Sequence, residues 1–158
     1  MKKMEKTNVM RILDQMNITY REHTYDSSEA ISGTEVASIL GQDPDQVFKT
    51  LVTVGASRQN YVFVIPVTRE LNLKKAARAA GEKSIQMIKS RELLPLTGYV
   101  HGGCSPIGMK KFFSTFLDET AMLFDTILFS GGRIGFPVEM NPEDLRAVIP
   151  FEYADLCD

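Results

Sequence analysis

Few residues of this chain suit disulfide, metal or membrane chemistry. Its 158 residues include two cysteines, Cys104 and Cys157, and two histidines, His23 and His101. Two cysteines are too few for a disulfide framework, which favours a reduced, cytoplasmic protein. These four residues lack the pair spacings of a zinc site, so no metal is expected. The longest apolar run, residues 61–67, is far shorter than a membrane span of about 20 residues. The charged N-terminus is not followed by the apolar segment of a secretory signal.

Length and composition indicate one ordinary globular domain over residues 1–158. Hydrophobic residues make up 44% of the chain and charged residues 24%, which excludes a disordered polar chain. A chain of this length buries roughly 70% of its unfolded surface, enough to fold without disulfides or metals. The sequence has no internal repeat, low-complexity tract or long linker.

Charge is distributed unevenly along the chain. The net charge of −2 argues against a protein that binds polyanions over its whole surface. Residues 68–91 nevertheless hold seven basic and two acidic side chains, whereas residues 139–158 hold one basic and six acidic side chains. The basic stretch either meets an anionic partner or forms solvated helix faces.

The hydrophobic pattern predicts a mixed α/β (α+β) fold, because helices and strands do not alternate strictly. The strand at 61–67 is apolar on both faces, so it is expected at the centre of a sheet beside 48–54. Ser32 and Glu35 have the spacing of a capping box, and Gly41 suits the end of that helix. Helices are expected at 7–16, 32–40, 72–80, 90–94 and after the segment 141–144, and strands at 19–23, 48–54, 61–67, 112–117, 126–129 and 134–140.

Lys49 is unusual because it lies in a segment of strong β character between apolar neighbours. A lysine at a strand start is commonly a surface residue that extends its ammonium into solvent. Apolar neighbours on both sides make a lysine that lines a pocket equally credible.

Two glycine clusters could present backbone amides to a ligand. Gly102 and Gly103 lie in a long loop that follows Pro95, and Gly131 and Gly132 follow Ser130 between two expected strands. Consecutive amides in such turns form anion nests or oxyanion holes. The first cluster is not a phosphate-binding P-loop, because its lysine falls one position late and no Ser or Thr follows. The second cluster is either a plain hairpin turn or a ligand-facing hydroxyl with amides.

His101 and Cys104 are close enough in sequence to form a nucleophilic pair, although a structural role is the more common one for a loop cysteine. Cys157 lies one residue from the end of the sequence, where chains tend to fray.

Five segments, in order along nearly the whole chain, resemble the YbaK/EbsC-type Cys-tRNA(Pro) deacylases, which are relatives of the editing domain of bacterial prolyl-tRNA synthetases. The segments are ISGTEVA (31–37), DPDQVFKTL (43–51), LNLKKAA (71–77), GYVHGGCSPIG (98–108) and SGGR (130–133). The resemblance implies a single domain with a barrel-like mixed central sheet and flanking helices. It also implies a pocket for the 3′ end of aminoacyl-tRNA, and neither a metal nor an organic cofactor.

Matched segment by segment, the resemblance also implies roles for individual residues. Lys49 is the lysine required for activity, and Gly102 and Gly103 supply amides for the developing oxyanion. Tyr25, Thr50 and Ser130 line the pocket. Cys104 departs from the family pattern, since many relatives carry an aliphatic residue there. The basic residues Lys74, Lys75 and Arg78 could meet the tRNA backbone.

The implied reaction is assisted by the substrate, because the cysteinyl thiol attacks its own ester carbonyl and leaves as a cyclic thiolactone. Prolyl-tRNA synthetase is a plausible partner by family analogy. Two alternatives stay open: an Ala-tRNA(Pro) deacylase that uses an activated water, and a non-catalytic binding module.

Overall fold

The structure is a computed structural model that describes residues 6–28 and 32–158. Ile31, the first residue of the ISGTEVA segment, lies outside the described residues. The fold is a single mixed α/β domain, as the sequence predicts. In the described part of the chain, no helix combines the length and the apolar character needed to cross a bilayer.

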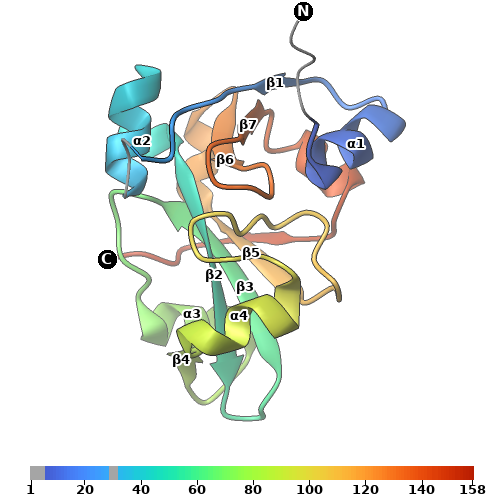
Figure 1. The fold of residues 1–158 in the computed structure, drawn as a ribbon. Helices are drawn as coiled ribbons and strands as arrows, with labels where there is room; N and C mark the ends of the chain where they lie inside the picture. Colours follow the sequence, from blue (N-terminus) through green and yellow to red (C-terminus); the bar gives the residue numbers. More distant parts are fainter. Residues whose placement is uncertain (1–5, 29–31) are drawn as a thin grey trace, which may run out of the picture.

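A five-stranded sheet forms the centre of the molecule (Figure 1), with strand order β4-β2-β3-β5-β8. β3 (Asn60–Pro66) is the middle strand, as its apolar faces predict. It pairs antiparallel with β2 (Phe48–Gly55) and parallel with β5 (Ser114–Asp118). The outer strands β4 (Ile85–Met87) and β8 (Glu152–Ala154) were not predicted, because three residues are too few for a periodic pattern.

A second sheet of three strands lies above the first in Figure 1, with order β1-β7-β6. It consists of β1 (Tyr20–Glu22), β7 (Pro137–Met140) and β6 (Ile127–Ser130). A parallel bridge between Val47 and Leu128 joins the two sheets. The sheets are therefore continuous at one corner but do not close into a barrel.

Two helices cover opposite faces of the large sheet. α3 (Leu73–Ala80) packs Ala76 and Ala77 against Phe63 of β3, whereas α4 (Ser90–Thr97) packs on the face of β2 that carries Val52. α1 (Asn8–Gln15) packs in the main hydrophobic cluster, between the α4 face of the large sheet and the small sheet. α2 (Gly33–Leu40) packs against Val47, where the two sheets meet.

Helix ends follow the capping residues in the sequence. The Ser32 hydroxyl accepts a hydrogen bond from the Glu35 amide at 3.2 Å, and Gly41 ends α2 in the left-handed conformation. A 3-10 turn, η1 (Pro44–Gln46), begins at Asp43 and leads directly into β2. These caps fix where β2 begins and so where Lys49 lies.

Several expected boundaries were wrong. α4 continues through Pro95 to Thr97, although a loop was expected after the proline. The last helix is only a 3-10 turn, η3 (Asp144–Ala147), because Asn141 caps Glu143 locally and Pro150 soon interrupts the chain. β7 begins at Pro137 rather than Ile134, because residues 131–136 form a loop closed by a hydrogen bond from Gly131 to Phe136. A further 3-10 turn, η2 (Glu119–Leu123), follows β5.

Candidate active site

A cleft of about 720 Å³ opens beside the first half of β2. β4 pairs only with Thr53, Val54 and Gly55, so the β4 ladder leaves the edge of β2 near Lys49 uncovered. α2, the turn at 100–103 and the loop at 130–137 surround this edge. The lining includes Tyr25, Lys49, Thr50, His101, Gly102 and Ser130.

The fold thus brings together predicted residues from distant parts of the sequence. Tyr25 comes from the segment after β1, and its amide donates to the carbonyl of Gly135 at 3.1 Å. Ser130 ends β6. Five of the six residues expected in the pocket or at the reacting ester therefore line one cavity, and Gly103 lies buried directly behind Gly102.

Lys49 lines the cleft, and its ammonium group is only weakly paired within the protein. Its side chain is 31% exposed, and its Nζ lies 3.9 Å from a carboxylate oxygen of Glu70, whose side chain is 90% exposed. An ion pair this long and this solvated is weak. An anionic ligand can therefore displace Glu70 at little cost.

Two hydroxyl groups of the cleft are positioned to meet a ligand. Thr50 Oγ1 is buried and has no hydrogen-bond partner among the described residues. A buried hydroxyl without a partner is costly, which suggests that a ligand supplies the missing bond. The Ser130 hydroxyl accepts a hydrogen bond from the Gly132 amide at 3.1 Å, so its own proton can be donated into the cleft.

The turn at 100–103 uses one of its two glycine amides internally. The Gly103 amide donates to the carbonyl of Val100 at 3.0 Å, and Gly102 adopts φ +86°, a conformation that side chains disfavour. Gly103 packs so closely on the 130–137 loop that an added Cβ would lie 3.2 Å from the Ile134 amide nitrogen. Of the two amides, only that of Gly102 has no acceptor among the described residues, so the expected pair of oxyanion donors is reduced to one.

Cys104 has the properties of a core residue. Burial raises the pKa of its thiol to about 12, and the side chain belongs to the main hydrophobic cluster. A neutral thiol is a poor nucleophile, so His101 and Cys104 do not form an activated pair. In the described residues, no three His, Cys, Asp or Glu side chains gather as a metal site would require.

We predict that neither cysteine is labelled rapidly by a thiol reagent at pH 8. Cys157 is also buried rather than frayed, and burial with the nearby Asp118 carboxylate raises its pKa to about 12. Labelling by iodoacetamide should accelerate only after unfolding in denaturant. Fast labelling of the native protein, with Cys104→Ala and Cys157→Ala to identify the site, would contradict this assignment.

A polar network connects the segment before Lys49 with the segment before Tyr25. Glu139 of β7 accepts hydrogen bonds from His23 Nε2 at 2.8 Å and from the Thr126 hydroxyl at 2.5 Å, and Gln46 Nε2 donates to the Thr126 carbonyl at 2.7 Å. Burial opposes ionisation of Glu139, but the bonds from Thr126 and His23 outweigh it, and the pKa of Glu139 lies below its ordinary value. The network ties η1, just before Lys49, to the end of β1, just before Tyr25. Sequence reasoning missed it because its members are far apart in the chain.

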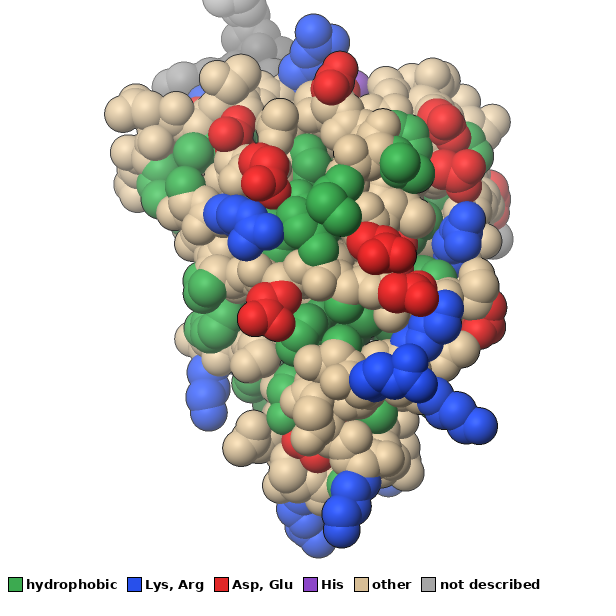
Figure 2. All heavy atoms as spheres, turned by 180° about the vertical axis from the view of Figure 1, so that it is seen from behind, with side chains coloured by type: hydrophobic (Ala, Val, Ile, Leu, Met, Phe, Trp, Pro, Cys, Tyr) green, Lys and Arg blue, Asp and Glu red, His purple; other side chains and the backbone are tan. Residues whose placement is uncertain are grey.

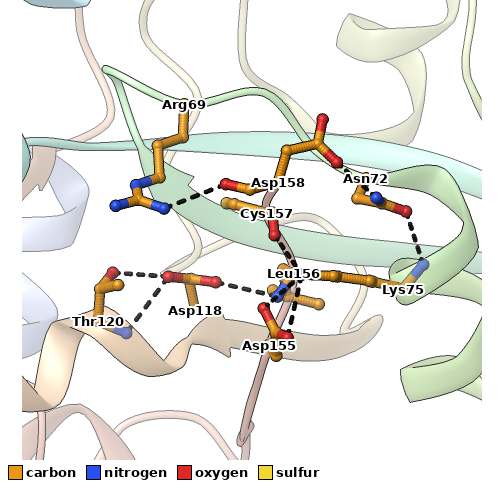
Figure 3. A network of polar contacts seen from close by, with 9 residues as sticks. All are labelled: Arg69, Asn72, Lys75, Asp118, Thr120, Asp155, Leu156, Cys157 and Asp158. Atoms are coloured by element: carbon orange, nitrogen blue, oxygen red, sulfur yellow. Dashed lines mark hydrogen bonds and ion pairs between the residues drawn. The ribbon is translucent and has the colours of Figure 1, made fainter.

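The basic residues of α3 lie outside this cleft, and one of them has a structural role. Lys75 donates to the Asp155 carboxylate at 3.0 Å and to the Cys157 carbonyl at 2.6 Å, which fastens the C-terminal segment to the helix (Figure 3). Asn72, the cap of α3, and Asp118 of β5 hold the same segment. The contact of Lys74, Lys75 and Arg78 with a tRNA backbone stays a prediction; Lys75 is half-buried, whereas Lys74 and Arg78 are exposed.

The fold and the cleft define a small α/β domain with a pocket lined by a lysine, two hydroxyl groups and glycine turns. Residues 28–148 match the model of the aminoacyl-tRNA editing domain family, and the chain belongs to that family.

Relatives extend the likeness to almost the whole chain. The "Putative Cys-tRNA(Pro)/Cys-tRNA(Cys) deacylase EbsC" of Enterococcus faecalis is 42% identical over 98% of this chain and 95% of its own. A proline–tRNA ligase of Shouchella clausii is 34% identical over 52% of this chain, which corresponds to 14% of that enzyme. The solved structure of a "putative trans-editing enzyme for prolyl tRNA synthetase" has a TM-score of 0.81 at 24% identity, covering 98% of this chain and 99% of its own, and supports the fold.

Proposed function

We propose that this protein is a trans-editing deacylase that removes cysteine from mischarged Cys-tRNA(Pro), and also from Cys-tRNA(Cys), by cleaving the aminoacyl ester. The observation that carries the proposal is the convergence of Lys49, Thr50 and Gly102 in one cleft of an editing-domain fold. The name of the 42% identical relative specifies these two substrates. Residues 1–158 would act as one editing domain in the cytoplasm, where aminoacyl-tRNA is found.

In this proposal Lys49 binds the 3′ end of the tRNA as a point charge. Its weak pairing with exposed Glu70 leaves the ammonium available for a phosphate or ribose oxygen. Thr50, Ser130 and Tyr25 would orient the terminal ribose and the amino acid. The protein mainly holds the ester in a reactive geometry, which is worth an effective molarity on the order of 10⁵ M or more for an intramolecular attack.

The substrate provides the nucleophile. The cysteinyl sulfur forms a bond to its own carbonyl carbon, and the tetrahedral oxyanion lies near the free Gly102 amide. The carbonyl carbon–ribose oxygen bond then breaks, and the proton lost by the thiol ends on the ribose hydroxyl. The products are a cyclic thiolactone, which water later opens, and uncharged tRNA. Loss of one oxyanion donor typically lowers the rate by about 10² to 10³.

The lining of the cleft offers few groups that could activate a water molecule. No carboxylate lines the cleft among the described residues, and His101 is its only imidazole. Removal of alanine, which has no thiol, would need such a base.

The decisive experiment compares deacylation of Cys-tRNA(Pro), Ser-tRNA(Pro) and Ala-tRNA(Pro). Serine is the matched control, since it replaces the thiol by a hydroxyl of similar size. Cleavage of the cysteinyl ester alone would support the proposal. Equal cleavage of the alanyl or seryl ester would exclude assistance by the substrate thiol, and no cleavage of any ester would favour a binding module. Addition of prolyl-tRNA synthetase tests whether that enzyme, the proposed partner, supplies tRNA specificity.

Thr50→Val should separate activity from stability. The Thr50 hydroxyl makes no bond to the described residues, so its removal should leave the free energy of unfolding unchanged or raise it by up to about 1 kcal/mol. Deacylation should fall about tenfold, since one hydrogen bond to the substrate is lost. Thr50→Ser is the control and should keep most of the activity. A parallel loss of stability and activity in Thr50→Val would show that the hydroxyl is structural.

A further inference from the structure

A second hollow of about 500 Å³ lies next to the cleft, near the end of the β2–β3 hairpin. It is lined by Val54, Arg58, Asn60, Arg91, Glu92, Pro95 and Leu96. The two cavities share β2 and α4: Leu51 and Leu93 line the cleft, whereas Val54 and Arg91 line the hollow. Thr50 of the cleft and Val54 of the hollow point to the same face of β2 and are four residues apart on an extended strand, about 13 Å. A single extended ligand can therefore occupy both.

The positive charge of this hollow is not neutralised internally. Arg58 and Arg91 are exposed, and neither forms an ion pair or a side-chain hydrogen bond with any described residue. Two acids lie nearby, Glu92 in the lining itself and Glu82 beside the hairpin turn. Neither pairs with an arginine in the described part of the chain, so Arg58 and Arg91 outnumber the one carboxylate of the lining and the hollow stays positive. Glu92 accepts from the Lys89 amide at 2.9 Å, and Glu82 accepts from the Tyr61 hydroxyl at 2.6 Å and from Ser57.

Lys and Arg side chains are also frequent at this end of the molecule. Figure 2 shows several of them at the lower end of the rear face, which is the end of the β2–β3 hairpin but the face opposite to α4 in Figure 1. Lys83 and Lys89, which flank β4, are exposed and add to the positive potential. The hollow therefore attracts anions over a distance comparable with the Debye length, about 8–10 Å at moderate salt.

The backbone holds Arg58 in an unfavourable conformation. Its φ is +74°, a region that glycine and asparagine tolerate far better than arginine. The turn is held there by 2.8 Å bonds from Gly55 to Gln59 and from Arg58 to Gly55, and by the Glu82 carboxylate on the Ser57 amide at 3.1 Å. A strained residue in a rigid turn is a sign of function rather than of stability.

We propose that this arginine hollow (Arg58 and Arg91) binds a phosphodiester of the same RNA strand whose 3′ end occupies the cleft. The inference rests on the proposed function. Guanidinium groups form bidentate hydrogen bonds with phosphate oxygens. A stacked strand rises about 3.4 Å along its axis per nucleotide, so a separation of about 13 Å corresponds to roughly four nucleotides from the 3′ terminus. The arginine hollow thus distinguishes a polynucleotide ester from a small cysteinyl ester.

The test uses the double variant Arg58→Asn/Arg91→Gln in the full chain. Asparagine tolerates the conformation of residue 58, so the hairpin should be kept. Arg11→Gln, which removes an exposed charge from α1 at the other end of the molecule, is the matched control. The substrates are a cysteinylated RNA minihelix with a single-stranded 3′-ACCA end and the cysteinyl ester of adenosine.

We expect the ratio of kcat/KM for the minihelix to kcat/KM for the adenosine ester to fall about 10- to 100-fold in the double variant, mainly through KM. The slope of log affinity against log salt should become shallower by about 0.7, the value for one phosphate contact on a single strand. Arg11→Gln should leave the ratio unchanged. An unchanged ratio and slope in the double variant would overturn the proposal.

Binding of the uncharged minihelix, measured by fluorescence anisotropy, separates this inference from the proposed function. If the wild-type protein cleaves no ester but binds the minihelix, and the double variant binds it 10- to 100-fold more weakly, the deacylase proposal fails and the arginine hollow stands. If the minihelix binds both proteins equally, while only the double variant loses a response to added prolyl-tRNA synthetase, the hollow is a protein-docking surface and the inference is wrong.

Discussion

Lys49→Ala should lower the kcat/KM for Cys-tRNA(Pro) about 30-fold or more. Removal of one partner from a charged, partly desolvated contact typically costs 2–5 kcal/mol, and each 1.4 kcal/mol is a factor of ten. The free energy of unfolding should change by less than about 1 kcal/mol, because the lysine's pairing with exposed Glu70 is long and solvated. The measurement is a single-turnover deacylation assay combined with a thermal melt.

Two further variants define how Lys49 acts. Lys49→Arg should keep most of the activity with an unchanged pH profile if the residue serves as a positioned charge. Lys111→Ala removes an exposed lysine outside the cleft and should change neither activity nor stability. If Lys49→Ala remains fully active, the cleft described here is not the reaction site.

Gly131→Ala should damage both the fold and the reaction. A Cβ at this position would lie 2.3 Å from the backbone oxygen of Phe136 and 3.2 Å from a methyl group of Val138, so the backbone itself must move. Overpacking of this kind costs about 1–3 kcal/mol, which lowers Tm by roughly 2–12 °C in a chain of this length. Because the loop that must move carries residues of the cleft wall next to Ser130, deacylation should fall as well.

Gly81→Ala is the control for Gly131→Ala. Gly81 ends α3 with φ +72°, and an added Cβ would meet no atom within 4 Å. It should lower stability by about 1 kcal/mol through backbone strain alone and leave kcat/KM unchanged. If Gly131→Ala is as stable and active as the wild-type protein, the loop is more adaptable than its contacts indicate.

The sequence predicted the structure best where an element depends on interactions between residues that are close in sequence, such as helix caps and strand patterns. The β character of residues 48–54 and the continuous apolar run at 61–67 predicted the central hairpin, and the caps at Ser32 and Gly41 predicted α2. The prediction was poorest for β4 and β8, whose formation depends on neighbours distant in sequence. The contact of Lys75 with the C-terminal segment was not predicted, because nothing in a local pattern indicates that this segment returns to α3.

The sequence by itself determined the family and the residues of the cleft, since Lys49, Thr50, Gly102 and Ser130 lie in short segments with characteristic spacing. Only the tertiary structure decided what each of them can do. In the folded chain the Gly103 amide donates to a carbonyl of its own turn, and the Thr50 hydroxyl has no partner among the described residues. Burial keeps the Cys104 thiol neutral by raising its pKa. Packing also placed Arg58 and Arg91, 33 residues apart in sequence, on one hollow beside the cleft. Hydrogen-bond satisfaction and burial depend on which segments meet in space, and a linear pattern of residues does not contain that information.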